Sequence, residues 1–201
     1  MKLLLTGFGP FPGVDVNPTM PVVDNLDGQT IGDYDIVGRI LPVVFSEVKA
    51  ALHQAIDDVQ PDMIVSLGVA AGRYHITPER IAVNIASSSK PDNNGHIATE
   101  EPIDAEGPHS YVTRLPITHI VEALKAANYP ASISNTAGTY VCNTVMYEGL
   151  RYAERQHIPA GFIHIPANFE LSIAHGRVPG WHQRDLNDAI FLAIETIVKM
   201  A

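Results

Sequence analysis

The sequence predicts an α/β protein, a three-layer α/β/α sandwich around a twisted, mostly parallel open sheet. Apolar runs of strand length alternate with segments of helical periodicity along the whole chain. Several of these runs are apolar at nearly every residue, as is typical of strands that helices bury on both faces. No repeat, linker or low-complexity tract divides residues 1–201, so we expect one domain.

Short apolar runs mark the expected strands. These runs occupy residues 3–5, 35–44, 63–67, 81–86, 131–135 and 161–165. The first run opens into a loop shaped by glycine and proline at 7–13. The run at 81–86 alternates between large apolar residues and small or polar ones, which indicates a strand buried on one face.

Apolar residues at spacings of three and four mark the expected helices. These helices cover residues 46–60, 116–128, 141–153 and 186–198. Ser46 is the expected N-cap of the first helix, and Pro61 ends it. The segment 87–110 is rich in Ser, Pro, Asp, Asn and Gly and predicts a long functional loop.

The net charge and the cysteine content indicate which partners and which cellular compartment to expect. The formal net charge is −9, with 13 basic against 22 acidic residues, which disfavours nucleic acid as a partner. The single cysteine cannot form an internal disulfide, which is typical of a reducing compartment. The longest apolar stretches, 40–45 and 189–194, are much shorter than a membrane span. We therefore expect a cytoplasmic protein that binds neither nucleic acid nor membrane.

Three side chains that can do chemistry fall at the expected carboxyl ends of the sheet, where ligands bind in such folds. Cys142 follows the run at 131–135 and lies near the start of the next helix. His164 lies at the end of the run at 161–165, and Glu79 directly precedes the run at 81–86. A helix N-terminus and a neighbouring imidazole both lower the pKa of a thiol, and a carboxylate orients the imidazole. The pattern predicts a cysteine nucleophile with a lowered pKa.

Structural roles are the alternative for each of these residues. A lone cysteine is more often a small buried apolar residue, and a histidine at a strand end is more often a hydrogen-bonded structural residue. Glu79 alone could be a solvated charge beside Arg80. The loop at 7–13 lacks the glycine spacing of a phosphate-binding loop, and no motif predicts a catalytic metal.

Several motifs in one register resemble the family of pyroglutamyl peptidase I, also called pyrrolidone-carboxylate peptidase. The motifs are TGFGPF at 6–11 with NP at 17–18, AGR at 71–73 with ITPER at 76–80 and Asn84, PDN at 91–93, GP at 107–108, SNTAGTYVCN at 134–143 with VMY at 145–147, and GFIHIP at 161–166. They span nearly the whole chain, and each longer block is specific to the family.

The resemblance implies roles for the three candidate residues. Cys142 would be the nucleophile, His164 the general base and acid, and Glu79 the residue that orients His164. The family removes an amino-terminal pyroglutamyl residue from small peptides without cofactor or metal. It is commonly cytosolic and forms homodimers or homotetramers. The resemblance therefore implies a single catalytic domain over residues 1–201, with pyroglutamyl peptides as substrates.

The resemblance also places Phe8, Phe11, Val69 and Val141 at substrate-binding positions. Phe8 and Phe11 match positions that flank the lactam ring, and core packing is their alternative role. Val69 stands where the family commonly has glutamine. The chain also departs from the family at Gly9, where an acidic residue is usual, and at residues 89–90 and 167–170. These departures affect the expected substrate preference more than the reaction class.

Two further functions stay open from the sequence. The altered residues near the pocket are compatible with a related cysteine amidohydrolase that accepts a different acyl group. They are also compatible with a binding module that has kept the fold and lost turnover.

Overall fold

A computed structural model describes residues 1–10 and 16–201 of the chain, and its main sheet has six strands in the order β2-β3-β1-β4-β8-β5. The strands are β1 Lys2–Phe8, β2 Thr30–Ile31, β3 Tyr34–Leu41, β4 Met63–Val69, β5 Thr77–Pro78 and β8 Ala160–Ile165. Strands β3, β1, β4 and β8 are parallel, whereas the short edge strands β2 and β5 run antiparallel to their neighbours. The mostly parallel open sheet predicted from the sequence is confirmed.

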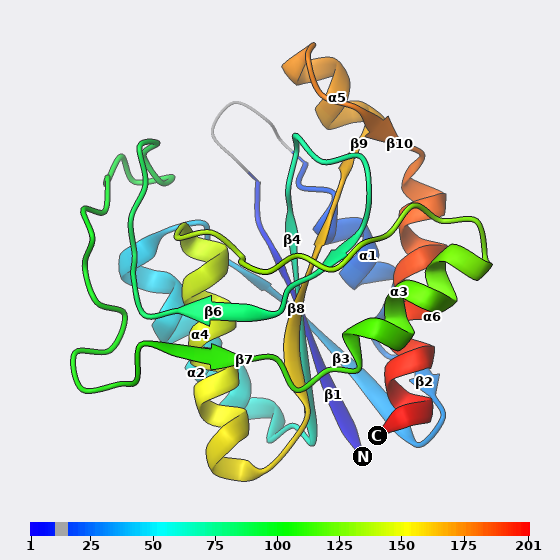
Figure 1. Cartoon of the computed structure of the whole chain (residues 1–201), viewed down its shortest axis with the longest axis horizontal. Coiled ribbons are helices and arrows are strands. Elements are labelled where there is room, and N and C mark those ends of the chain that lie inside the picture. The colour runs from blue at the N-terminus through cyan, green and yellow to red at the C-terminus, as the bar shows by residue number, and fades with distance from the viewer. Residues whose placement is uncertain (11–15) are drawn as a thin grey trace.

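Helices cover both faces of this sheet (Figure 1). Helices α1 Thr19–Leu26, α3 Ile117–Ala126 and α6 Gln183–Met200 pack on one face, and α2 Phe45–Val59 and α4 Val141–Gln156 pack on the other. The strand residues alternate between the two cores: Leu3 and Leu5 pack under α1 and α6, while Leu4 packs under α2 and α4. Apolar side chains on both faces of each inner strand thus explain the three predicted layers.

Two small sheets and one short helix complete the fold. Strand β6 Ile81–Val83 pairs with β7 Ser110–Val112. Strand β9 Ala167–Asn168 pairs with β10 Gly180–Trp181, and α5 Phe169–His175 lies between them. In Figure 1 this last unit projects beyond the carboxyl edge of the main sheet.

Several sequence predictions of local structure are wrong. Residues 131–135 form no strand: they make only isolated bridges, Ile76 with Ala131 and Glu79 with Ser134. The expected strand at 81–86 is limited to β6, and α1 was not expected at all. Ser46 does not cap α2, because that helix begins one residue earlier, at Phe45.

A buried carboxylate from the long loop takes the place of the expected cap. Asp92, which is 2% exposed, accepts a hydrogen bond from the Phe45 backbone N–H at 2.9 Å through Oδ2. Its Oδ1 accepts from the backbone N–H groups of Asn94 and His96, both at 2.9 Å. The loop 87–110 is therefore fastened to the N-terminus of α2, where helix geometry leaves amide donors free.

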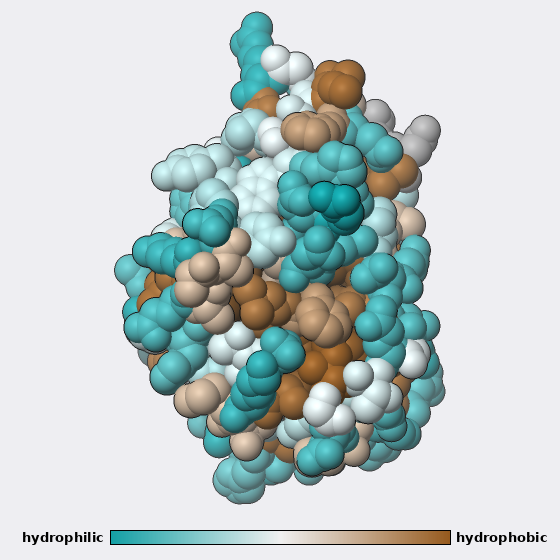
Figure 2. Space-filling model, turned by 90° about the vertical axis from the view of Figure 1, so that its right-hand side faces the viewer, coloured by the Kyte–Doolittle hydropathy of each residue, from teal (hydrophilic) through white to brown (hydrophobic). Residues whose placement is uncertain are grey.

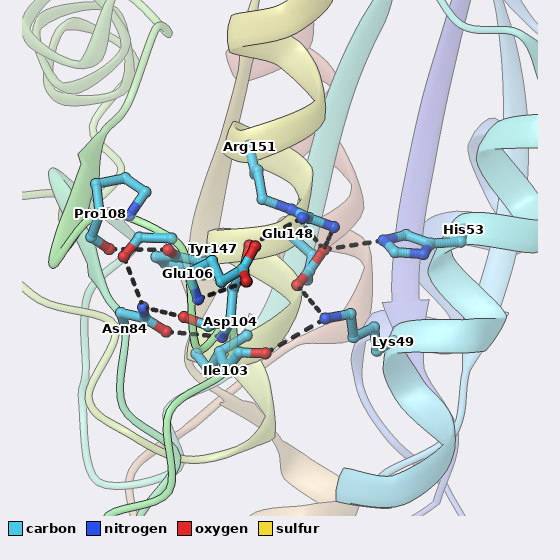
Figure 3. A network of polar contacts seen from close by, with 11 residues as sticks. Lys49, His53, Asn84, Ile103, Asp104, Glu106, Pro108, Tyr147, Glu148 and Arg151 are labelled. Atoms are coloured by element: carbon cyan, nitrogen blue, oxygen red, sulfur yellow. Dashed lines mark hydrogen bonds and ion pairs between the residues drawn. The ribbon is translucent and has the colours of Figure 1, made fainter.

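A polar network fastens the other end of this loop to α4 (Figure 3). The fully buried carboxylate of Glu148 lies 2.9 Å from Lys49 Nζ, 2.9 Å from His53 Nε2 and 2.7 Å from Arg151 Nη2. Arg151 Nη1 lies 2.9 Å from Asp104 Oδ2 in the loop. The network thus joins α2, α4 and the loop.

The face formed by α3 and α6 carries apolar surface bordered by hydrophilic side chains (Figure 2). Phe191 of α6 is 39% exposed, and on α5 Phe169 is 53% and Ile173 81% exposed.

Among the helices that the structure describes, none is long and apolar enough to cross a membrane.

Candidate active site

His164 and Glu79 form a direct, buried hydrogen bond at the carboxyl edge of the sheet. His164 is the penultimate residue of β8, and its Nδ1 lies 2.7 Å from Glu79 Oε1. Glu79 directly follows β5, and its backbone N–H donates to the Phe162 carbonyl of β8 at 2.9 Å. The His164 residue is 5% exposed and Glu79 is fully buried. The carboxylate can therefore fix the orientation and the tautomer of the imidazole.

Cys142 is the second residue of α4 and lies over the β4–β8 pair. A Cβ atom placed on Gly68 would meet Cys142 Sγ at 3.0 Å and Phe162 Cζ at 2.7 Å. Gly68 is paired with His164 in the β4–β8 register, so both residues point toward the same face of the sheet. The structure thus brings the sulfur, the imidazole and the Glu79 carboxylate to one edge and one face.

The pKa of the Cys142 thiol is shifted in the direction opposite to the sequence prediction. Burial and then the negative charge of Glu79 raise the pKa of Cys142 to about 12, although its own backbone N–H lowers it. The residue keeps only partial exposure to solvent. Desolvation and a nearby anion both disfavour the thiolate, and together they outweigh the helix N-terminus. Burial and the Glu79 charge thus favour the protonated thiol.

Glu79 stays ionised in spite of its burial. Burial by itself would raise the pKa of Glu79, but the hydrogen bond and charge of His164, with smaller contributions from Ser134 and Arg73, lower the pKa overall. The same oxygen that meets His164, Oε1, also accepts from Arg73 Nη1 at 2.7 Å. A carboxylate with two such donors can stabilise an imidazolium when His164 takes up a proton.

The start of α4 is pinned by a buried amide side chain next to the cysteine. Asn143 Oδ1 accepts from the Val83 backbone N–H at 3.0 Å, and Asn143 Nδ2 donates to the carbonyls of Val83 at 2.8 Å and Ile85 at 3.0 Å. The first amide N–H groups of a helix have no carbonyl partner within it. At this fixed position they can stabilise an oxyanion that develops near Cys142 Sγ.

The expected substrate-binding residues fall into three groups. Phe8 is 2% exposed, belongs to the core under α2 and α4, and its ring centroid lies 6.4 Å from that of Phe162. Val141 is fully buried in the same core. Val69 instead packs against the core on the opposite face, and Phe11 lies outside the described residues. The structure brings Phe8 and Val141, but not Val69, to the face that holds Cys142.

Sequence reasoning missed Gly68 and Arg73. A glycine at the end of a buried strand is a sign that another group approaches the backbone closely, and this sign could have indicated Gly68. Nothing local in the sequence indicates that Arg73 reaches the Glu79 carboxylate. Within the described part of the chain, no group of His, Cys, Asp and Glu side chains is arranged to hold a metal ion.

Comparison with known proteins identifies the family. The family model described as pyroglutamyl peptidase matches residues 1–200. The chain belongs to the pyroglutamyl peptidase family. The family resemblance seen in the sequence motifs is thereby confirmed.

Relatives of known name cover almost the whole chain. The pyrrolidone-carboxylate peptidase of Lysinibacillus sphaericus is 54% identical over 199 residues, which are 98% of this chain and 97% of the relative. That of Halalkalibacterium halodurans is 43% identical over 198 residues, or 97% of this chain and 98% of the relative.

Solved structures of the family share the fold. A mutant pyrrolidone carboxyl peptidase from Pyrococcus furiosus aligns with a TM-score of 0.94 at 39% identity and covers 100% of this chain and 99% of its own. The pyroglutamyl peptidase I of Bacillus amyloliquefaciens aligns with a TM-score of 0.94 at 40% identity and covers 98% and 97%. The chain is thus a cysteine peptidase of this family by sequence and by fold.

Proposed function

We propose that this protein hydrolyses the amide bond that follows an amino-terminal pyroglutamyl residue in small peptides. The family match over residues 1–200 carries the proposal. The His164–Glu79 hydrogen bond of 2.7 Å, on the same face as Cys142 at the start of α4, supports it. Cys142 is the proposed nucleophile, His164 the general base and acid, and Glu79 the orienting carboxylate.

The first chemical step forms a thioester. Cys142 Sγ attacks the pyroglutamyl carbonyl carbon while His164 Nε2 accepts the thiol proton. Because burial and Glu79 raise the pKa of Cys142, the thiol needs His164 as a base to take up its proton. Amide N–H groups at the start of α4 stabilise the oxyanion of the tetrahedral intermediate.

The remaining steps release both products. The imidazolium of His164 donates its proton to the leaving amine, and the carbon–nitrogen bond breaks. A water molecule then attacks the thioester carbonyl as His164 accepts one of its protons, and free pyroglutamate leaves as the Cys142 thiol re-forms. Glu79 holds the Nδ1–H of His164 through both steps, so that Nε2 stays directed at the reacting atoms.

The substrate is a neutral lactam, which suits an apolar pocket with a few directed hydrogen bonds. Phe8 and Val141 are the proposed apolar contacts on the Cys142 face, and Phe11 and Val69 are proposed from the family motifs. We expect no cofactor, so chelators should leave activity unchanged and thiol reductants should preserve it. Loss of activity with EDTA that zinc restores would contradict this mechanism.

The assembly and compartment are proposals as well. We propose a cytoplasmic homodimer or homotetramer, as the family resemblance implies. Ile173 of α5, at 81% exposure, and Phe169, at 53%, support association, because exposed apolar clusters commonly mark interfaces. Size-exclusion chromatography with light scattering measures the oligomer directly, and a monomer at all concentrations would contradict it.

A chromogenic pyroglutamyl amide tests the activity. The native protein should hydrolyse it and leave the matching proline amide intact, and Cys142→Ala should abolish turnover. A native protein that alkylates with iodoacetamide at Cys142 but does not hydrolyse the pyroglutamyl amide would favour a different acyl specificity. Failure in both reactions would favour a binding protein without turnover.

A further inference from the structure

Arg73 shares one carboxylate oxygen with the candidate catalytic histidine. Arg73 Nη1 and His164 Nδ1 each lie 2.7 Å from Glu79 Oε1, and the Glu79 side chain is fully buried. Arg73 Nη1 also donates to Thr77 Oγ1 at 2.6 Å. Two cationic or potentially cationic groups therefore meet at a single oxygen.

We propose that Arg73 is a positioning residue for the reaction: through its bond to Glu79 Oε1 it sets the pH range in which the Cys142–His164 pair is reactive. The inference rests on the proposed function, because it assigns to Arg73 a task within that reaction. Arg73 acts through Glu79, because its guanidinium bonds to Glu79 and Thr77.

The backbone that carries Arg73 is fastened to the strands of the site. The Ala70 backbone N–H donates to the Ile165 carbonyl at 2.9 Å, and the Arg73 backbone N–H donates to the Ala70 carbonyl at 2.8 Å. Thr77, the second partner of the guanidinium, is paired with His164 in the β5–β8 register. The Arg73 side chain is 33% exposed. Its backbone is nevertheless attached to β8 through Ala70, and its guanidinium is attached to β5 through Thr77.

The groups around Glu79 explain why the positive charge of Arg73 affects the Cys142–His164 pair. Glu79 is approached by His164 from β8, Arg73 from the turn after β4, Ser134 from the neighbouring segment and the Cys142 thiol from α4. His75 lies close enough to Arg73 for that positive charge to lower its pKa, although burial is the larger cause. Arg73 is therefore the permanent positive charge that offsets the Glu79 carboxylate.

The sign of the effect follows from the charge of the Cys142–His164 pair. Each of its two deprotonation steps removes one positive charge from the pair, so a nearby cation favours both steps. Without Arg73, the uncompensated Glu79 carboxylate holds the protons more tightly. Both limbs of the bell-shaped pH profile then move to higher pH.

The experiment compares Arg73→Gln with Arg73→Lys and Arg80→Gln. Arg80 is the matched control because it adjoins Glu79 in sequence, yet its exposed side chain donates to Asn135 Oδ1, at 3.0 Å, and not to Glu79. In Arg73→Gln the midpoints of both limbs of the plot of kcat/KM against pH should move to higher pH by about one unit. At a fixed pH on the acid limb, kcat/KM should therefore fall about tenfold. Arg73→Lys keeps the positive charge, so its profile should return most of the way to the native one. Arg80→Gln should follow the native profile.

Alkylation of the single cysteine by iodoacetamide gives a readout that needs no substrate. The pH midpoint of the alkylation rate should rise in Arg73→Gln and stay native in Arg80→Gln. If Arg73→Gln loses kcat uniformly while its alkylation midpoint and the limbs of its kcat/KM profile stay at the native pH, Arg73 has a structural role and the inference is overturned. Equal shifts in Arg73→Gln and Arg80→Gln would overturn it as well. If the native protein does not hydrolyse the pyroglutamyl amide but the alkylation midpoint still shifts, the proposed function fails and the inference about the pair stands.

Discussion

Gly68 shows that a missing side chain shapes this site. The position lies at the end of β4, opposite His164, and the space above its Cα is filled by the Cys142 sulfur and the Phe162 ring. A side chain there would compete with the proposed nucleophile for the same volume. The arrangement of sulfur and imidazole therefore depends on a residue that takes no part in the chemistry.

We expect Gly68→Ala to lower kcat/KM for a pyroglutamyl amide by about ten- to a hundredfold, because the new Cβ would displace Cys142 Sγ by a fraction of an ångström or more. The contacts at 2.7 Å to Phe162 Cζ and 3.0 Å to Cys142 Sγ require one of these groups to move. Gly72→Ala is the matched control, because its Cβ would have no neighbour within 4 Å. Native activity in Gly68→Ala would show that the sulfur does not need this space.

Glu79 should make the stability of the protein depend on pH below its ordinary pKa of 4.5. Its pKa is lowered in the folded state, so its ionised form stabilises the fold above 4.5, and this contribution is lost as the pH falls through the folded pKa. Glu79→Gln lacks this titration. The difference in the free energy of unfolding between native and Glu79→Gln, from urea titrations, should shrink as the pH falls.

If the difference in unfolding free energy between the native protein and Glu79→Gln did not change with pH, this assignment would be contradicted.

At neutral pH, Glu79→Gln should also lower kcat by about a hundredfold or more, since a neutral amide cannot stabilise the imidazolium of His164.

At the level of elements, the loop 87–110 is tied to helices at both of its ends. Asp92 binds the start of α2, and Asp104 binds Arg151 of α4. Ahead of the Asp92 anchor, the Ser87 backbone N–H donates to the Thr139 carbonyl at 2.8 Å, three residues before Cys142. The loop is thus attached to α2, to α4 and to the segment that precedes Cys142.

Asp92→Ala should reduce the free energy of unfolding by about 2–3 kcal/mol, because three partly buried amide donors lose a buried, charged acceptor. The donors are the backbone N–H groups of Phe45, Asn94 and His96. Urea denaturation followed by circular dichroism measures the change. Asn94→Ala keeps the backbone donor and removes only an exposed bond to Glu47, so it should change stability by less than about 0.5 kcal/mol. Equal effects of the two substitutions would contradict the role of Asp92.

Across the whole molecule, one buried carboxylate connects three parts of the chain. Glu148 on α4 binds Lys49 and His53 on α2, and through Arg151 it reaches Asp104 in the long loop (Figure 3). Glu148 lies in the middle of α4, and the same helix carries Cys142 as its second residue. The packing of α2 against α4 therefore influences where the proposed nucleophile lies.

We expect Glu148→Ala to destabilise the protein by about 3–5 kcal/mol, since it leaves Arg151, whose side chain is 18% exposed, without its fully buried anion. Thermal unfolding and urea titration at neutral pH measure the loss. Glu195→Ala is the control: Glu195 pairs with Lys199 on the surface of α6, where a pair contributes less than about 1 kcal/mol. A loss no larger than that of the control would show that hydrophobic packing alone holds α2 on α4.

Much of the fold follows from local patterns, and the exceptions have a common cause. The helices α2, α3, α4 and α6 follow from their apolar periodicity, and β1, β4 and β8 from their apolar runs. The run at 131–135 resembles a strand but makes only isolated bridges, to Ile76 and Glu79 on either side of the two-residue strand β5. Helix α1 was missed because the prolines on and before it obscure the pattern. Pairing partners, and not propensity, decide such cases.

The sequence by itself determined the fold class, the family and the three residues proposed for catalysis, because motifs and periodicity are properties of neighbouring residues. Only the tertiary structure decided that the Cys142 thiol has a raised pKa, that Gly68 makes room for its sulfur, and that Arg73 shares an oxygen of Glu79 with His164. It also decided that Val69 faces the other core. Burial, charge proximity and the facing of a side chain arise where segments distant in sequence meet, and no local pattern encodes them.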